Sequence, residues 1–370
     1  MGTPMDAGSA AVLPTEQRIT HFFTDRAWIE GRAVDQLNQI GAWAGVARAA
    51  AFPDLHPGKY GPVGCAVIAD RVYPHLIGSD IGCGMSLFQL DLAPRKFKLD
   101  MAMRRIRALG APLDDAPHDR LEAVGLPADL FAEALGTIGG GNHFCEVQIV
   151  ASADAGLDPA RLCLLVHSGS RGLGASILSR LGNCADGLTE DEALDYLRLH
   201  DQAVAWAALN RQLIAERAAD ALRADATLIA DAPHNLLART QDGWLHRKGA
   251  AVAGPLVPLA GSRATASYLM RCLDQPAALN SMAHGAGRRY DRSSMHGRVR
   301  SKRSDLEAMQ RTPFGGRVIC EDRDLLVEEA PAAYKSAEAV AADLEATGVA
   351  ERVATLHPLL TFKKTREGAQ

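Results

Sequence analysis

The stretch SDIGCGM, residues 79–85, puts an acid and a cysteine three residues apart in a glycine-rich segment. The apolar runs VGCAVIAD (63–70) and MSLFQLDL (85–92) on either side predict two strands, with SDIGCGM as part of the connection between them. Glycines beside Asp80 and Cys83 allow tight turns and the close approach of a ligand. We therefore interpret Asp80 and Cys83 as half of a metal site, whose other half is a set of dispersed histidines.

Further segments repeat this junction of strand and glycine loop. TIGGGNHFCEVQIV (137–150) is a glycine loop that leads into a predicted strand, and RLCLLVHSGSRGLG (161–174) is a strand that leads into a glycine loop. The polar residues at junctions of this kind are Asn142, His143, His167, His234 and His284. Mixed oxygen, nitrogen and sulfur donors suit Mn, Fe, Co or Zn better than Mg or Ca. A lone histidine is more often structural, so the metal interpretation depends on their joint occurrence.

The pattern of elements predicts an α+β fold in a single complex domain. Short strands and helices do not alternate as in a doubly wound sheet, and no GxGxxG joins a strand to a helix. We expect residues 1–20 to be a flexible tail and residues 21–370 to form the domain. In segment 25–45, Trp28, Ile29, Ala33, Leu37 and Ile40 recur at helical spacing. The other predicted helices are 97–110, 119–136, 189–222, which Thr189 and Glu192 would cap, and 328–348, which Pro331 would open.

Composition restricts the classes of protein to which the chain can belong. The chain has 370 residues, 47% of them hydrophobic, and a net charge of -4, which suit an ordinary soluble protein with a packed core. No run of apolar residues is long enough for a membrane span, and the N-terminal sequence does not resemble a secretory signal. Seven cysteines without a CxxC pair argue against a disulfide framework and a zinc ribbon. We expect a cytoplasmic protein with no membrane partner.

A basic run lies near the glycine turns. Residues 288–303 hold seven Arg or Lys against the single acid Asp291. A charge run is usually a solvated face, but in an acidic chain this local bias is also a candidate nucleic-acid patch. The turns GGGN (139–142), SGSRG (168–172) and HGAGRR (284–289) are either simple turns or anion-binding nests.

Eight motifs occur in an order that resembles the RtcB family of GTP-dependent RNA ligases. They are DIGCGM, GGGNHFCE, VHSGSRG, HNLL, HRKGA, GSRATASY, HGAGR and EEAPAAYK. The resemblance runs from about residue 50 to residue 363. The resemblance implies the fold of that family, with several mixed or antiparallel sheets surrounded by helices. One motif departs, because AGSRA (260–264) stands where the family usually has PGSMG. The chain is also at the short end of the family.

The resemblance also implies the site residues. Asp80, Cys83 and His143 would hold one Mn²⁺ ion, and Cys83, His167 and His234 would hold a second. His284 would be the catalytic residue that becomes guanylylated. Asp54 and His56, in PDLHPGKYG (53–61), would be supporting residues. The GTP-binding residues would be Asn142, His143, Phe144, Cys145, Glu146, His234, Asn235, Ala260, Gly261, Ser262, Arg263, Ser267, His284, Gly285, Ala286, Gly287 and Lys363.

The activity that the resemblance implies is the joining of RNA 3′-phosphate or 2′,3′-cyclic phosphate ends to 5′-hydroxyl ends, through a histidine–GMP intermediate. Such an enzyme would serve RNA repair or tRNA splicing, and we expect a monomer, with an archease-like activator as a conceivable partner. Two alternatives remain from the residues alone. One is a two-metal phosphoesterase or nuclease that forms no nucleotide adduct, and the other is a non-catalytic RNA-binding protein that uses the 288–303 patch.

Overall fold

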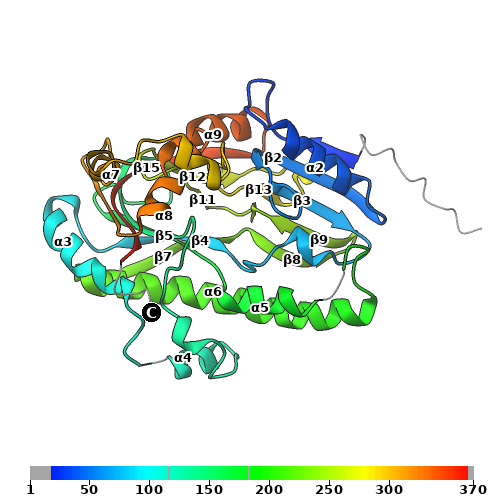
Figure 1. Ribbon diagram of the computed structural model, residues 1–370, viewed down its shortest axis with the longest axis horizontal. Helices are drawn as coiled ribbons and strands as arrows, with labels where there is room; N and C mark the ends of the chain where they lie inside the picture. The colour runs from blue at the N-terminus through cyan, green and yellow to red at the C-terminus, as the bar shows by residue number, and fades with distance from the viewer. Residues whose placement is uncertain (1–17, 116, 182–183, 366–370) are drawn as a thin grey trace, which may run out of the picture.

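The computed structural model describes residues 18–115, 117–181 and 184–365. The predicted tail of residues 1–20 falls mainly outside this part of the chain, and Ile19 and Thr20 at its end lie in strand β1. Three sheets are packed together and flanked by helices (Figure 1). The predicted α+β class is confirmed.

The largest sheet carries most of the residues discussed below. Its strand order is β11-β12-β15-β5-β6-β4-β7, with β14 paired to β15. Neighbours are antiparallel except β14 and β15, which are parallel. The strands are β4 (Gly84–Leu90), β5 (Phe144–Ala153), β6 (Leu162–Ser168), β7 (Ala226–Pro233), β11 (Val257–Leu259), β12 (Ser267–Cys272), β14 (Arg317–Cys320) and β15 (Ala350–Lys364).

A five-stranded sheet and a two-stranded sheet complete the framework. The first has the order β1-β2-β3-β9-β8, with only β1 and β2 parallel, and the second pairs β10 with β13. Mixed and antiparallel sheets are thus observed as expected. Their strands are β1 (Ile19–His21), β2 (Val46–His56), β3 (Val63–Ala69), β8 (Asn235–Thr240), β9 (Gly243–Lys248), β10 (Ala250–Val252) and β13 (Ser281–Ala283).

Helices cover two opposite sides of these sheets. The long α6 runs below the strands in Figure 1 and contacts β4, β6, β7 and β8, whereas α2 and α9 lie above. As predicted, α6 begins after Thr189, whose backbone N–H donates to the Glu192 carboxylate at 2.8 Å. The helices are α2 (Gly31–Gly41), α3 (Leu99–Ile106), α4 (His118–Ala123), α5 (Gly172–Arg180), α6 (Glu190–Leu222), α7 (Arg303–Met309), α8 (Arg323–Glu328) and α9 (Ala337–Ala346).

Three predicted helices are shorter than expected. The segment 25–45 is helical only from Gly31, so Trp28 and Ile29 precede α2. The segment 119–136 stops being helical at Ala123, because Gly125 takes a positive φ of 75°. The segment 328–348 is not one helix: Pro331 opens a single 3₁₀ turn (Pro331–Ala333), and α9 starts afresh after Ser336, whose hydroxyl accepts from the N–H of Ala339.

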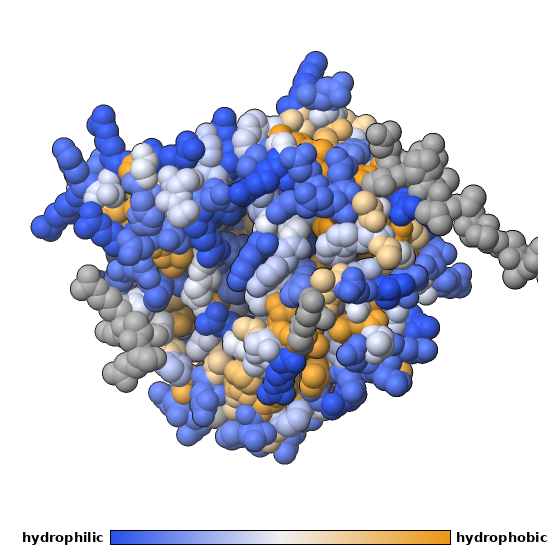
Figure 2. All heavy atoms as spheres, turned by 45° about the vertical axis from the view of Figure 1, so that its right-hand side comes forward, coloured by the Kyte–Doolittle hydropathy of each residue, from blue (hydrophilic) through white to orange (hydrophobic). Residues whose placement is uncertain are grey.

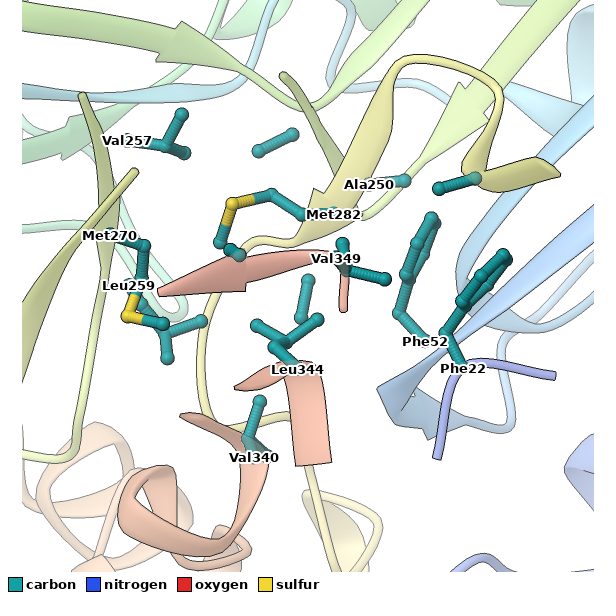
Figure 3. Packing of buried hydrophobic residues seen from close by; sticks show 14 of the residues in the cluster. Phe22, Phe52, Ala250, Val257, Leu259, Met270, Met282, Val340, Leu344 and Val349 are labelled. Atoms are coloured by element: carbon teal, nitrogen blue, oxygen red, sulfur yellow. The ribbon is translucent and has the colours of Figure 1, made fainter. Parts of the chain in front are cut away.

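Apolar side chains fill the space between the layers. In one cluster the rings of Phe22 and Phe52 stack with centroids 5.8 Å apart, and Met282 and Leu344 pack nearby (Figure 3). The outer face shown in Figure 2 is mostly hydrophilic, with apolar atoms in scattered patches. Among the described residues, no helix is long and apolar enough to cross a membrane.

Candidate metal centre and active site

The loop that carries Asp80 and Cys83 is compressed between α6 and the sheets. Gly82 has a φ of 71°, and a Cβ on it would lie 2.8 Å from Cα of Val204 in α6. Its N–H donates to the carbonyl of Asn235 at 2.8 Å. Only glycine combines this conformation with this close approach, so the loop sequence is set by its packing.

Strand register brings the predicted ligands to one edge of the large sheet. Gly84, at the start of β4, pairs with Ser168 at the end of β6 and with Pro233 at the end of β7. In β5 the first residue, Phe144, pairs with His167. Because these neighbours are antiparallel, the starts of β4 and β5 meet the ends of β6 and β7. Cys83, His143, His167 and His234 therefore converge, although 151 positions separate the first from the last.

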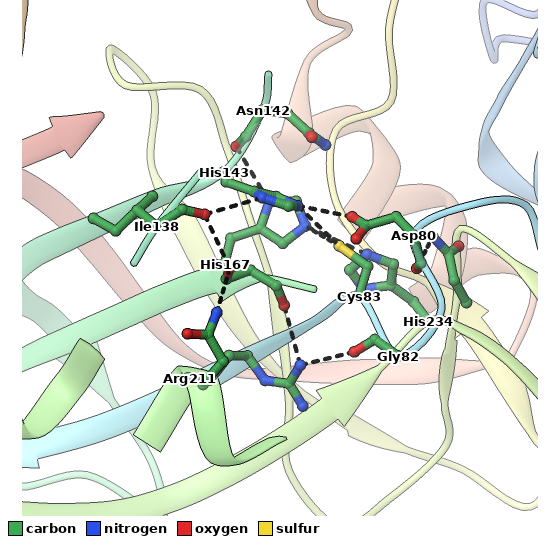
Figure 4. A network of polar contacts seen from close by, with 12 residues as sticks. Asp80, Gly82, Cys83, Ile138, Asn142, His143, His167, Arg211 and His234 are labelled. Atoms are coloured by element: carbon green, nitrogen blue, oxygen red, sulfur yellow. Dashed lines mark hydrogen bonds and ion pairs between the residues drawn. The ribbon is translucent and has the colours of Figure 1, made fainter. Parts of the chain in front are cut away.

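The ligand atoms form two groups that share one sulfur (Figure 4). Sγ of Cys83 lies 3.4 Å from Nε2 of His143 and 3.3 Å from Nε2 of His167. Nε2 of His143 lies 2.9 Å from Oδ2 of Asp80, and Nε2 of His167 lies 3.4 Å from Nε2 of His234. The two groups are Asp80, Cys83, His143 and Cys83, His167, His234, as the resemblance implies.

The hydrogen bonds behind the rings suit a cation in front of them. Nδ1 of His143 lies 3.1 Å from the carbonyl of Ile138, and Nδ1 of His167 lies 3.3 Å from that of Asn142. A carbonyl accepts only from N–H, so a neutral His143 or His167 ring carries its lone pair on Nε2. In His143 this would set the Nε2 lone pair against Oδ2 of Asp80 at 2.9 Å, a meeting of two acceptors that a cation between them would relieve. Nδ1 of His234 is buried without a hydrogen-bond partner among the described residues. A buried sulfur surrounded by nitrogen and oxygen donors is a ligand set that fits divalent ions such as Mn, Fe, Co or Zn.

Protonation states agree with ligand roles. Burial lowers the pKa of His167 and of His234 well below the usual value, so both rings are neutral near pH 7. Burial opposes ionisation of Asp80, but His143, Cys83 and His167 outweigh it and lower its pKa to about 2. Burial, and then the charge of Asp80, raise the pKa of Cys83, so a cation would have to displace the thiol proton on binding.

A buried arginine lies under this edge of the sheet. The guanidinium of Arg211, in α6, is fully buried and donates to the carbonyls of Gly82 (2.8 Å) and Ser168 (3.1 Å). These carbonyls belong to the residues next to Cys83 and His167. Asp231 in β7 pairs with Nε and Nη2 of the same guanidinium at 2.8 and 2.9 Å. Arg211 thus ties together the two chain segments that carry these ligands (Figure 4).

His284 completes the cluster of histidines. It directly follows β13, and its ring lies against that of His234, with centroids 4.5 Å apart. Nδ1 lies 2.6 Å from Oδ2 of Asp54 and 2.6 Å from the carbonyl of Gly249. Both neighbours are acceptors, so the proton of a neutral ring is held on Nδ1 and the lone pair is on Nε2.

A cavity of about 580 Å³ opens beside these residues. Of the predicted nucleotide-binding residues, those that line it are Asn142, His143, Phe144, Glu146, His234, Asn235, Ala260, Gly261, Ser262, Arg263, His284, Gly285, Ala286, Gly287 and Lys363.

Two predicted nucleotide-binding residues do not line the cavity. The side chain of Cys145 points to the opposite face of β5, into an apolar cluster with Val147, because side chains alternate along a strand. Ser267 lies behind the cavity wall, where its hydroxyl accepts from the N–H of Gly261 at 3.0 Å and from Nε2 of Gln148 at 3.2 Å. Both residues stay predictions as nucleotide contacts: the structure leaves Cys145 only its backbone to offer, and it gives the Ser267 hydroxyl a role in supporting the loop.

Comparison with known proteins gives the family. The model of the family described as tRNA-splicing ligase RtcB matches residues 36–123 and 118–364. The RNA-splicing ligase RtcB2 of Escherichia coli (strain ATCC 25922) is 41% identical, with 96% of this chain and 98% of that protein covered. The chain belongs to the RtcB family. It is therefore a ligase.

More distant RtcB proteins also match along most of the chain. The RNA-splicing ligase RtcB of Mycobacterium tuberculosis is 28% identical over 88% of this chain and 99% of its own length. That of Escherichia coli K12 is 26% identical over 90% of this chain and 94% of its own length. The residues matched by the family model include the candidate metal ligands, His284 and Lys363.

One wall of the cavity in this RtcB protein is basic and is organised by a single buried acid. Glu329 lies 3.0 Å from Nη1 of Arg288, 3.6 Å from Nε of Arg292 and 3.7 Å from Nζ of Lys363, and it accepts from the hydroxyl of Tyr334. Burial opposes its ionisation, but Lys363 and Arg292 outweigh it, so its pKa is lowered. Neither Glu329 nor Tyr334 was predicted from the sequence as a site residue, although both lie in the motif EEAPAAYK.

The departure from the RtcB pattern at AGSRA has a structural role. Arg263 is buried, and its guanidinium donates to the carbonyls of Leu326 (2.9 Å) and Glu329 (2.8 Å). The arginine therefore anchors the 260–263 loop to the end of α8.

Arg171 also lines this cavity. Its backbone has φ 57° and ψ -135°, a conformation that non-glycine residues adopt rarely and chiefly at functional sites. The guanidinium occupies the space above Gly139, where a Cβ would lie 1.7 Å from Nη1. Nε is buried without a hydrogen-bond partner among the described residues. Because its backbone is strained and its buried Nε is available as a donor, Arg171 beside Asp80 and Cys83 is suited to bind an anionic ligand.

Proposed function

We propose that this protein joins RNA 3′-phosphate or 2′,3′-cyclic phosphate ends to 5′-hydroxyl ends, with GTP as the energy source and two Mn²⁺ ions as cofactors. The observation that carries the proposal is the contact between His284 and His234, which sets a lone-pair nitrogen beside the candidate metal groups. Relatives named RNA-splicing ligases along nearly the whole chain support the RNA substrate.

Asp80, Cys83 and His143 would hold one ion, and Cys83, His167 and His234 the other. Bound manganese would neutralise phosphate charge and orient the phosphates for in-line displacement. Arg211 keeps the ligand-bearing segments together through the carbonyls of Gly82 and Ser168.

His284 is proposed as the nucleophile. Asp54 and Gly249 both accept at Nδ1, so the neutral ring carries its lone pair on Nε2, which would attack the α-phosphorus of GTP. A P–N bond forms, the bond to the bridging oxygen breaks, and pyrophosphate leaves. A 2′,3′-cyclic phosphate end would first be hydrolysed: a water oxygen adds to phosphorus, the bond to the 2′-oxygen breaks, and that oxygen takes up a proton. In the second step an oxygen of the RNA 3′-phosphate attacks the phosphorus of the adduct, and the P–N bond breaks.

The third step forms the phosphodiester. The RNA 5′-hydroxyl attacks the activated 3′-phosphorus, loses its proton to solvent, and displaces GMP. Arg171, with its unpartnered buried Nε beside the ligands, is proposed to hold phosphate oxygens in this step.

The guanine base is proposed to lie near Glu146 and Lys363. The Glu146 carboxyl is oriented by the hydroxyl of Thr361 at 2.5 Å and by Nε2 of Gln148 at 2.7 Å. Burial raises the pKa of Glu146 and lowers that of Lys363. An oriented carboxyl group is a suitable partner for the N–H groups on one edge of guanine.

Trapping of the covalent intermediate tests this proposal. Wild-type protein, incubated with α-labelled GTP and Mn²⁺, should form an acid-labile protein–GMP adduct, and His284→Ala should form none. His118→Ala, which removes an exposed histidine of α4, should label normally. RNA cleavage without any GTP requirement, and without an adduct, would favour the two-metal phosphoesterase instead.

The proposal extends to the resident metal, the biological process, the oligomeric state, a partner and the location. Manganese as the resident ion, RNA repair or tRNA splicing as the process, a monomeric state, an archease-like activator and a cytoplasmic location are all predictions. The seven cysteines are free in the structure, which suits a reducing compartment.

A further inference from the structure

Aromatic rings and basic side chains alternate on the surface next to the cavity. Arg289 lies over the ring of Trp28 and over that of Tyr290, at 5.4 Å from each centroid. Arg298 lies over Tyr290 at 3.9 Å, and Lys335 lies 5.7 Å from the centre of Trp28. We call Trp28, Arg289, Tyr290 and Arg298 the stacking ridge.

The stacking ridge continues into the cavity. Arg288, adjacent to Arg289 in the chain, lies over the ring of Tyr334 at 5.3 Å, and both residues line the cavity. The backbone N–H groups of Arg289 and Tyr290 both reach the carbonyl of Ala333, next to Tyr334, at 2.7 and 3.3 Å. A ligand bound on the stacking ridge would therefore lie next to the basic wall of the active site.

Exposure and charge suit an anionic ligand. The side chain of Trp28 is 41% exposed, which is unusual for so large an apolar ring. Asp291, the acid within 288–303, pairs with Arg32 at 3.2 Å, which offsets its negative charge. Among the described residues, no carboxylate lies within ion-pairing distance of Arg289 or Arg298.

We propose that the stacking ridge binds unpaired nucleotides of the RNA next to the reacting end, with a base stacked on Trp28 and phosphates along Arg289 and Arg298. Proteins that bind single strands combine aromatic faces with a basic track in this way. In a duplex the faces of the bases are already stacked on one another, so a duplex would make only the ionic contacts with Arg289 and Arg298. The inference rests on the proposed function and adds to it a preference for single-stranded RNA ends.

Fluorescence anisotropy with a labelled RNA of twelve nucleotides, free or annealed to its complement, tests the ridge. Trp28→Ala should weaken binding of the single strand roughly tenfold and leave the duplex nearly unchanged, and Trp28→Phe should keep most of the affinity. Arg298→Ala should weaken both forms and lower the salt dependence of binding by about one phosphate contact. Arg198→Ala, which removes an exposed charge from α6, the helix that runs below the sheets in Figure 1, should change neither.

Equal affinity of Trp28→Ala and wild type for the single strand would overturn the inference, as would an equal loss for single strand and duplex. Thermal melting of each variant separates loss of folding from loss of binding, and Trp28→Phe gives a second, milder substitution. The adduct assay on wild type is independent of RNA. If the adduct forms but the ridge does not contribute to RNA binding, this inference alone fails. If the ridge contributes to RNA binding but no adduct forms, the ligase proposal fails.

Discussion

Oδ2 of Asp54 lies 2.6 Å from Nδ1 of His284, and the Asp54 side chain is completely buried. The carboxylate also accepts from the backbone N–H of His284 at 3.2 Å. Two contacts to one residue fix both the position of the backbone and the tautomer of the ring, which is the condition for an available lone pair on Nε2.

Asp54→Asn should therefore slow formation of the GMP adduct by roughly 10²-fold or more, because the neutral amide no longer favours the Nδ1–H tautomer. The adduct should still form, since the carbonyl of Gly249 also accepts from Nδ1. Single-turnover labelling with GTP measures the rate. Labelling at the wild-type rate would show that Asp54 has no part in preparing the ring.

Cys83→Ala should remove both metal ions, since its sulfur belongs to both ligand groups. His234→Ala should affect one group only, so that metal analysis after dialysis in Mn²⁺ finds about two, one and no ions in wild type, His234→Ala and Cys83→Ala. Cys163→Ala, which removes a buried thiol at the other end of β6, is the matched control. A Cys83→Ala protein that retains both ions would contradict the assignment.

Arg211→Met should lower the free energy of unfolding by about 2–4 kcal/mol, because the carbonyls of Gly82 and Ser168 lose a buried donor. The double variant Arg211→Met, Asp231→Asn, which also removes the charge that paired with Arg211, should recover part of that stability. It should not recover tight metal binding, because the ties to the carbonyls of Gly82 and Ser168 are still missing. Calorimetric titration with Mn²⁺ makes the comparison, and normal affinity in the double variant would limit Arg211 to a role in stability.

Lys363→Ala should weaken GTP binding by roughly tenfold or more without changing the metal content, as expected for the loss of a charge-assisted hydrogen bond. The matched control is Lys364→Ala, whose ammonium pairs with Asp322 at 2.9 Å instead of facing the cavity. Titration with GTP measures affinity. A change in metal content in Lys363→Ala would mean that Lys363 acts on the metal groups instead.

Stability of the metal-free protein should fall as the pH is lowered from 7 to 5. Burial lowers the pKa of His246 to about 4, and its ring is bonded to Tyr73 and Val67, so the folded state resists a proton that the unfolded chain accepts near pH 6.5. At pH 5 this histidine alone accounts for about 2 kcal/mol. Glu146, whose pKa burial raises, acts in the opposite sense.

Urea unfolding in EDTA at both pH values tests this dependence. The loss of stability should shrink in His246→Gln and persist in His296→Gln, which changes an exposed ring. Equal stability of wild type at pH 7 and pH 5 would contradict the prediction.

Local sequence signals predicted much of the fold. The strands on either side of SDIGCGM were predicted correctly, and so was α6 with its capping residues. The long helix predicted over 328–348 was wrong, because helical periodicity does not register that Pro331 opens only a short 3₁₀ turn and that Ser336 caps a new helix. The same limitation made Trp28 look like part of a helix, whereas it is an exposed side chain beside Arg289.

The sequence by itself determined the inventory of chemical groups: five candidate ligands, the histidine of HGAGR and the glycines beside them are all recognisable from their motifs. Only the tertiary structure decided which of them meet, because antiparallel register brings the ends of four strands to one edge. It also decided that Cys145 faces the core and that Arg211 supports the ligand segments. A motif records residue types along the chain, whereas side-chain direction and contact depend on strand register and on the packing of segments distant in sequence.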